Sequence, residues 1–399
     1  MTLRTLIFWP HLIAGVIAGA LVLIMSVTGV VLTYERQFVA WGDGQFRSTQ
    51  PSADAGRLPI ATAMEALRRD HPEITPTAVV VGSASDAPIA VSVQQRTLYV
   101  DAYTGRLLGE GSQSVRRLMS SVRAWHRWLN VEGDGRATAR FFTGWSNFLF
   151  LFIVVSGFYL WFPRKWTFKH LRPVVWFTRT STAKARDFNW HNVIGAWSAI
   201  PLVIIVLSAL PMSFPWANAL IYRAVGEQPP VQGQGGRGGR EGGGVERAER
   251  GGRERAAVSL AGIDDLLARA EKQVPGWKTI NIRIPNSDRA PVAFAIDGGD
   301  GGQPQLRSTL TLNRATGEVV SYESFSDQSL GRRLRSIARF AHTGEVLGIP
   351  GQTIAGLATL GAVFLVYTGL SLVVRRYTAW LKRRRERATV SAPQESTAA

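Results

Sequence analysis

Residues 6–32 read LIFWPHLIAGVIAGALVLIMSVTGVVL, and this apolar stretch decides the fold. It contains no charged side chain and exceeds the roughly 20 residues that a helix needs to cross a bilayer. It is also longer than the apolar part of a cleaved signal peptide, and no small-residue cleavage site follows it, so we expect a retained helix. Three similar runs follow, at Phe141–Phe162, Val193–Leu210 and Ile354–Val374. The sequence therefore predicts four membrane spans and excludes a single soluble globule.

The net charge of +17 lies largely in two short segments beside the spans. Residues 164–186 and residues 375–387 each contain seven Lys or Arg side chains. Short basic segments stay in the cytoplasm, because their translocation is disfavoured. We therefore expect a membrane protein with both termini in the cytoplasm and two long segments on the outer side of the membrane. The lipid bilayer is the expected partner of these cations, and nucleic acid is not needed to explain them.

The two halves of the chain follow one plan. In each half an amphipathic helix pattern, Ile60–Asp70 or Leu260–Gln273, precedes three β-rich runs and a Thr-Gly turn. The β-rich runs are Thr77–Val81, Ile89–Gln94, Arg96–Asp101, Lys278–Ile284, Pro291–Ile296 and Ser308–Asn313. An Arg-Arg-Leu-x-Ser motif then precedes a histidine in each half. Because both halves begin on the same side, a pseudo-twofold axis should run along the membrane normal.

These patterns predict an all-α four-helix transmembrane bundle from a two-fold internal repeat, with two periplasmic α+β domains. Residues 232–256 have no counterpart in the first half, and their Gly/Arg/Glu composition is typical of a flexible insertion. The expected parts are helix 1 (1–35), periplasmic domain 1 (36–125), outer ligand segment with helix 2 (126–165), basic loop (166–188), helix 3 (189–216), flexible insertion (217–256), periplasmic domain 2 (257–341), outer ligand segment with helix 4 (342–376) and basic tail (377–399).

Four of the six histidines occupy equivalent places in the repeat. His11 and His191 lie near the cytoplasmic starts of spans, and His126 and His342 lie just before the returning spans. A twofold axis would turn each pair face to face, one pair in each leaflet. Two facing imidazoles are the axial ligands that haem iron accepts. Duplication of inert histidines would give the same pattern.

The absence of cysteine and the number of available ligands narrow the choice of cofactor. The chain has no cysteine, so iron–sulfur clusters and covalent haem attachment are excluded, and two b-type haems are expected. Zinc fits less well, because structural and catalytic zinc sites use four or three protein ligands. Gly15 and Gly195 follow their histidines by four residues and would leave room for a flat porphyrin. His71 is expected at a helix end and His170 on a solvated face.

Four motifs carry a family resemblance: Trp125–Leu129 (WHRWL), Ser156–Arg164 (SGFYLWFPR), Asp187–Gly195 (DFNWHNVIG) and His342–Gly351 (HTGEVLGIPG). Together they resemble the PepSY-associated transmembrane helix family over nearly the whole chain, apart from the insertion and the tail. The resemblance implies PepSY-like external domains and haem ligation by the four paired histidines. Members of this family include inner-membrane haem proteins that reduce ferric siderophores.

The resulting hypothesis is a transmembrane electron-transfer protein, an oxidoreductase whose acceptor is a periplasmic ferric siderophore or another periplasmic molecule. The donor, a quinol or a cytoplasmic reductase, is not encoded, since no Rossmann motif is present. Arg116, Arg117, Arg332 and Arg333 could contact haem propionates or an anionic chelate, or form an ordinary solvated helix face. The alternative is a haem-free periplasmic binding, sensor or protease-inhibitor module. A permease fits poorly, and no hydrolase motif is recognisable.

Overall fold

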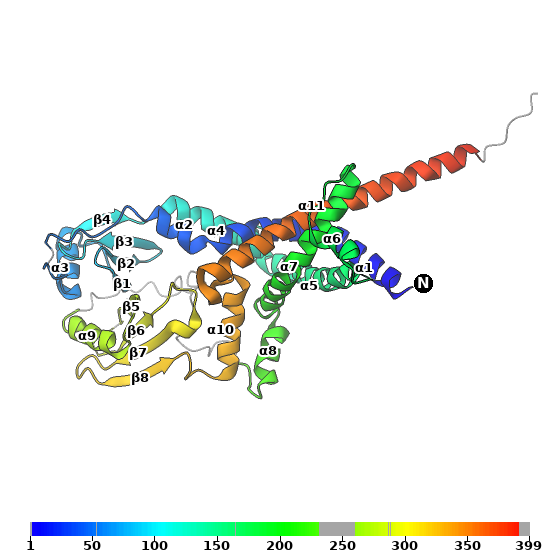
Figure 1. The fold of residues 1–399 in the computed structure, drawn as a ribbon. Helices are drawn as coiled ribbons and strands as arrows, with labels where there is room; N and C mark the ends of the chain where they lie inside the picture. Colours follow the sequence, from blue (N-terminus) through cyan, green and yellow to red (C-terminus); the bar gives the residue numbers. More distant parts are fainter. Residues whose placement is uncertain are drawn as a thin grey trace, which may run out of the picture.

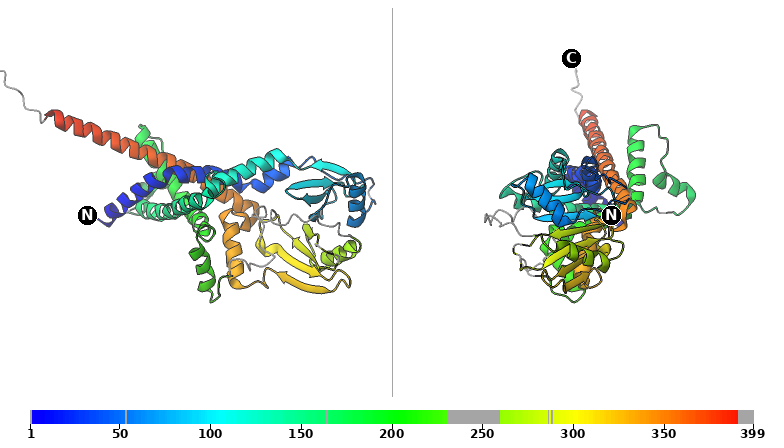
Figure 2. Two further views of the ribbon diagram at one scale, coloured as in Figure 1. Left: turned by 180° about the vertical axis from the view of Figure 1, so that it is seen from behind. Right: turned by 90° about the vertical axis from the view of Figure 1, so that its left-hand side faces the viewer.

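The computed structural model describes residues 2–52, 54–163, 165–230, 260–285, 287 and 289–390. The predicted insertion at residues 232–256 lies outside the described residues. Its expected start at residue 217 falls inside a helix, α8 (Pro215–Ala224), so the first part of that segment is helical. The described residues form an elongated molecule with a helical bundle at one end and a β-sheet at the other (Figures 1 and 2).

Four helices are long and apolar enough to cross a membrane. They are α1 (Leu3–Thr33), α5 (Gly135–Trp161), α7 (Ala183–Ser213) and α11 (Gly348–Val390). Both α1 and α7 pack against both α5 and α11, so α1 lies diagonally opposite α7. The bundle therefore contains the four predicted spans in an arrangement that places equivalent helices across from one another.

Small residues allow these helices to approach closely. Ala18 and Ala362 are buried between helices, and Gly19 packs against Leu370 of α11. Large apolar side chains such as Ile17 point outward and are exposed. This distribution is typical of membrane bundles, in which close packing replaces a hydrophobic driving force between helices.

Shorter helices connect the bundle to the sheet. They are α2 (Glu35–Gly42), α4 (Gln113–Trp128), α8 (Pro215–Ala224), α10 (Leu330–His342) and the 3₁₀ helix η3 (Glu345–Leu347). On the opposite side of the bundle, α6 (Phe168–Val175) lies against α7 (Figure 1).

The sheet is antiparallel and has eight strands in the order β4-β3-β2-β1-β5-β6-β7-β8. The strands are β1 (Ala78–Gly82), β2 (Ile89–Val93), β3 (Arg96–Val100), β4 (Leu107–Glu110), β5 (Thr279–Arg283), β6 (Val292–Asp297), β7 (Arg307–Leu312) and β8 (Val319–Ser324). The six predicted strands are present, and β4 and β8 are additional. The strands of the two expected α+β domains form one continuous sheet, because β1 of the first half pairs with β5 of the second half.

Two helices, α3 (Ile60–Asp70) and α9 (Ile263–Gln273), share one apolar core with the sheet. Met64 and Phe294 are among the largest fully buried side chains of this core. Helix α3 begins after Pro59 and has no side-chain cap of its own. Instead, the carboxylate of Asp264 in α9 accepts backbone N–H bonds from Ile60 at 2.5 Å and Ala61 at 3.2 Å. One half of the chain therefore caps a helix of the other half.

Candidate functional site

The outer histidine pair lies where the sheet-side helices meet the bundle. His126 is near the end of α4 and His342 is the last residue of α10. Their ring centroids are 6.2 Å apart, and the ring planes are inclined by 56°. After α10 the chain turns into η3 at Gly344, with φ of 76°, where a Cβ would clash with the carbonyl oxygen of Gly351. Glycine is therefore required at this turn, which sets His342 beneath the start of α11.

Each outer imidazole is oriented through Nδ1 by a helix of its own half. His126 Nδ1 lies 3.0 Å from Thr28 Oγ1 on α1. Thr28 Oγ1 already donates its proton to the carbonyl oxygen of Ile24 at 2.6 Å, so the imidazole must be the donor. His342 Nδ1 lies 2.8 Å from the carbonyl oxygen of Ile205 on α7 and donates to it. Both rings therefore carry their proton on Nδ1 and keep the Nε2 lone pair for another partner.

The inner pair follows the same rule. His11 Nδ1 lies 2.9 Å from Ser156 Oγ on α5, and His191 Nδ1 lies 3.0 Å from Thr368 Oγ1 on α11. Each hydroxyl donates to the carbonyl one turn earlier in its own helix, at 2.6 Å and 2.7 Å. Thus the structure brings the two outer imidazoles into ring contact, and all four predicted histidines have Nδ1 bonded to an oxygen of a neighbouring helix.

A glycine follows three of the four orienting residues. The dipeptides are Thr28-Gly29, Ser156-Gly157 and Thr368-Gly369. A Cβ on any of these glycines would lie between 3.0 Å and 3.4 Å from Cε1 of the adjacent imidazole, which is tight for non-bonded carbons. These hydroxyl–glycine dipeptides inside apolar spans are functional residues that the sequence patterns alone do not reveal. In the fourth site Ser208-Ala209 follows Ile205, and the carbonyl of Ile205 replaces the hydroxyl.

The outer pair has the spacing expected for two imidazoles that share one metal ion. Metal–nitrogen bonds of about 2 Å on opposite sides of an ion place two imidazole centroids about 6 Å apart. Burial lowers the pKa of His126 to about 4 and also lowers the pKa of His342. Both rings are therefore neutral near pH 7, which is the state that metal ligation requires. No cluster of three or more His, Cys, Asp or Glu side chains that could hold a metal ion occurs among the described residues.

The two pairs are separated by most of a span. Thr28, which holds His126, lies about 25 Å along α1 from His11 at 1.5 Å per residue. At the inner pair, a Cβ on Gly15 would meet no atom within 4 Å, whereas one on Gly195 would touch Leu365 at 3.7 Å. The space beside Gly15 fits the expected room for a flat ligand. His71 lies at the C-cap of α3, and exposed His170 bonds to Thr167.

Arg116 and Arg332 both pair with nearby carboxylates. Arg116 makes two bonds to the buried carboxylate of Asp43, at 2.9 Å and 2.6 Å. Burial alone would raise the pKa of Asp43, but hydrogen bonds from Arg116, a backbone N–H and Tyr99 hold it below its usual range. The same burial, with the Asp43 charge, raises the pKa of Tyr99 to about 12. Arg332 pairs with Glu323. These two guanidinium groups therefore have structural partners at the sheet–bundle junction.

The other two predicted arginines differ from each other in their surroundings. Arg117 is exposed and donates to the carbonyl of Gln113 at 3.3 Å. Arg333 is partly buried, with its guanidinium carbon 5.9 Å from the ring of Phe325.

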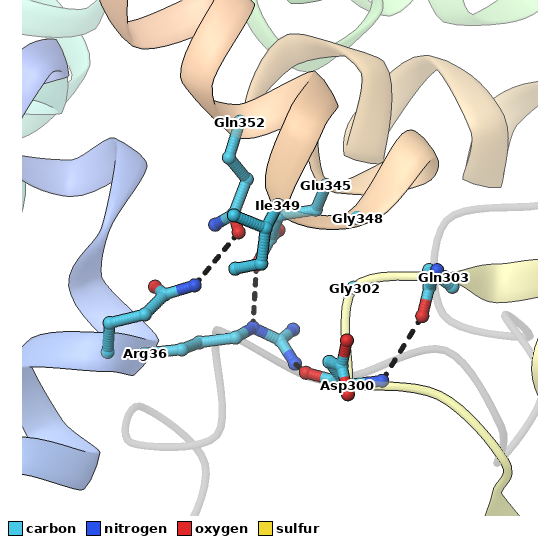
Figure 3. Close-up of a pocket in the computed structure, with 9 residues that line it drawn as sticks. Arg36, Asp300, Gly302, Gln303, Glu345, Gly348, Ile349 and Gln352 are labelled. Carbon is cyan, nitrogen blue, oxygen red and sulfur yellow. Dashed lines mark hydrogen bonds and ion pairs between the residues drawn. The ribbon is translucent and has the colours of Figure 1, made fainter.

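A small cavity of about 20 Å³ lies close to the outer pair along the chain (Figure 3). Arg36 of α2 forms an ion pair with Glu345 at 2.7 Å, and Asp300 of the β6–β7 loop lies beside it. Gln37 donates to Gln352 at 2.8 Å, and Gln352 in turn donates to a carbonyl at the end of α1. The cavity therefore contacts the sheet, α2 and α11 together, and the sequence patterns do not predict it.

No curated protein matches the chain. The family described as PepSY-associated TM region matches residues 8–376, which include all four spans, both histidine pairs and every strand of the sheet. The chain is therefore a member of the PepSY-associated transmembrane family.

Proposed function

We propose that His11 with His191, and His126 with His342, are the axial ligands of two haem b groups in an inner-membrane electron-transfer protein. The observation that carries this proposal is a shared geometry: each of the four imidazoles has Nδ1 within 3.0 Å of an oxygen on a neighbouring helix. Among the described residues no hydrogen bond to Nε2 is found, which leaves that atom for a metal. Metal-binding histidines usually have this second hydrogen bond, which fixes the ring and raises its basicity. A bound haem would supply reversible one-electron transfer.

The proposal also includes the direction of electron transfer across the membrane. We take the two halves as copies about an axis along the membrane normal, with the basic segments in the cytoplasm and the sheet in the periplasm. Electrons then enter at the inner pair, from a quinol or a cytoplasmic reductase, and leave at the outer pair. The acceptor is a ferric siderophore or another periplasmic molecule. One electron converts ferric to ferrous iron, which hard oxygen donors hold less tightly, so reduction favours release.

The second candidate is a haem-free binding or sensor module. The observation that favours it is the outer strand β8, whose Val319, Val320 and Tyr322 are exposed at an edge of the sheet. Free edges with apolar side chains can accept an extended peptide strand. This candidate gives the histidine pairs no role, so the two proposals are separated by haem content.

The test is to purify the protein from haem-replete cells and to count haem per chain from the pyridine haemochrome spectrum. We expect two haems per chain in the wild type and one in His126→Ala or His342→Ala. His71→Ala is the control and should keep both, because His71 only ends α3. A colourless wild-type protein would reject the haem proposal and favour the binding module.

The reductase activity needs a separate test. Dithionite-reduced protein, freed of excess reductant, is mixed anaerobically with a ferric hydroxamate chelate and a ferrous-specific dye. We expect one ferrous ion for each electron stored in the protein. A haem-containing protein that is not reoxidised by any ferric chelate would still transfer electrons, but to a different acceptor.

A further inference from the structure

Helix α6 (Phe168–Val175) is fixed to the bundle by side-chain hydrogen bonds at its C-terminal end. Trp161 of α5 and Trp197 of α7 each donate an indole N–H, at 3.0 Å, to one of the last two carbonyls of α6. The amide nitrogen of buried Asn189 donates to two further carbonyls, at 2.7 Å and 3.1 Å. These bonds come from the last residue of α5 and from the first half of α7, so they set α6 at a fixed depth on the side of the bundle away from the sheet (Figure 1).

The segment around α6 exposes large aromatic side chains. Their exposed fractions are 59% for Trp166, 73% for Phe168, 53% for Trp176 and 61% for Phe177. An aqueous surface would not expose four such side chains within twelve residues without a partner. Aromatic side chains of this kind are enriched where the bilayer meets water.

The same segment carries a row of cations. Lys169 and Arg172 lie on α6 and Lys165 lies just before it. All three are exposed, and none has an ion-pair partner among the residues that the structure describes. The nearest basic residues behave differently, because Arg186 and Arg375 both pair with buried Asp187. Asp187 therefore pairs with other cations and not with Lys165, Lys169 or Arg172.

We propose that α6 is an interfacial helix that binds acidic phospholipid headgroups, with Lys165, Lys169 and Arg172 in contact with the phosphates. The exposed aromatic side chains enter the boundary between headgroups and acyl chains, while the cations reach the headgroups. Each cation near an anionic surface strengthens the attraction, and three act together. This surface is independent of haem occupancy, so it can be tested in protein with or without a cofactor.

The experiment uses the full chain in nanodiscs of phosphatidylcholine, with or without phosphatidylglycerol as the probe, at about a third of the lipid to give an anionic surface. Native mass spectrometry counts retained phosphatidylglycerol, and hydrogen exchange follows the amides of α6. We expect phosphatidylglycerol to be retained and to slow exchange in α6. The triple variant Lys165→Gln/Lys169→Gln/Arg172→Gln should retain roughly tenfold less.

The matched control removes the same charge from the basic tail, in the triple variant Lys382→Gln/Arg383→Gln/Arg384→Gln. It should lose less phosphatidylglycerol than the α6 variant, because it removes only the lipid contacts of the tail, and it should keep slow exchange in α6. The variant Lys165→Arg/Lys169→Arg should also behave like the wild type, which separates charge from folding. The proposal would be overturned if both triple variants lost the same amount of phosphatidylglycerol. It would also be overturned if hydrogen exchange in α6 were equally fast with and without phosphatidylglycerol.

Discussion

Four oxygen atoms determine the tautomers of the paired histidines. At three sites the oxygen belongs to a hydroxyl that donates its own proton to a backbone carbonyl of the same helix. At the fourth site the oxygen is a backbone carbonyl. An oxygen that can only accept forces the imidazole to donate from Nδ1. The residue that prepares each ligand therefore lies on a neighbouring helix, not beside the histidine in the sequence.

Thr28 gives the first prediction at this scale. Thr28→Val keeps the shape of the side chain but removes the acceptor for His126, so affinity for the outer haem should fall by about 10- to 100-fold. Haem titration of the apoprotein measures this, and Thr28→Ser should restore affinity. Ser208→Ala is the matched control, because His342 bonds to the carbonyl of Ile205 instead. A loss in the control equal to that in Thr28→Val would contradict the assignment.

Gly15 gives the second prediction. An added side chain meets nothing within 4 Å, so Gly15→Leu should leave the apoprotein folded, while it fills the space expected for the porphyrin beside His11. We expect loss of the inner haem with retention of the outer one, read from haem content and from the melting temperature of the apoprotein. The small substitution Gly15→Ala is the control and should keep more inner haem. Full haem content in Gly15→Leu would show that the ligand lies elsewhere.

At the scale of elements, the start of α4 is built around one buried carboxylate. Asp43 accepts from the backbone N–H of Ser112 at 2.7 Å, from Tyr99 at 2.8 Å and from both terminal nitrogens of Arg116. The carboxylate thus caps α4 and ties it to α2 and to the sheet. Since α4 ends near His126, this junction also supports the outer pair.

This junction predicts an acid-sensitive stability. The pKa of Asp43 is lowered in the folded protein, so its contribution is complete above the unfolded value near about 4 and is lost as the pH falls through the lower folded value. Arg116→Ala should cost about 2 to 3 kcal/mol near neutral pH, because it leaves a buried carboxylate without its main partner. Thermal unfolding in detergent at pH 7 and pH 3 measures this loss of stability. The difference in stability between the wild type and Arg116→Ala should be smaller at pH 3. The neighbouring exposed Arg117→Ala is the control and should change little; a pH-independent deficit would contradict the role of Asp43.

Local patterns were sufficient for most elements. The four spans follow from apolar length, and six strands follow from alternating burial, as in the pattern of β7. Strand β4 contains Gly109 and lacks alternation, while β8 is exposed along most of its length. Edge strands of this kind give no periodic signal. Their presence depends on a neighbouring strand that local sequence does not identify.

The candidate site was predictable only in part. Symmetry in the sequence paired the four histidines, but their Nδ1 partners are 98 to 177 residues away along the chain. Such contacts depend on which helices pack together, and neither spacing nor composition encodes that. The same reason applies to Arg116, whose partner Asp43 is 73 residues away.

At the scale of the whole molecule, pairing of β1 with β5 makes the sheet continuous. All five residues of β1, from Ala78 to Gly82, oppose residues of β5. A disulfide can test whether this junction stays closed during function, because the chain has no cysteine of its own. Val80 and Asn281 are directly opposed, and opposed residues in antiparallel strands lie within the Cα distance that a disulfide spans.

We predict that the oxidised Val80→Cys/Asn281→Cys protein keeps its haem content and its rate of chelate reduction. Stopped-flow reoxidation of the reduced protein measures the rate, and the same variant kept in a thiol reductant is the control. If crosslinking stopped electron transfer while both haems remained, the two halves of the sheet would have to separate in each cycle.

The pairing of β1 with β5 also limits the kinds of transport that this protein could carry out. A carrier that works by alternating access must rock one half of its fold against the other. Here such a rotation would shear the middle of a β-sheet, where β1 and β5 are hydrogen-bonded and their apolar side chains are buried. A fold with this continuous sheet is better suited to moving a species across the membrane without a large conformational change. An electron is the smallest such species.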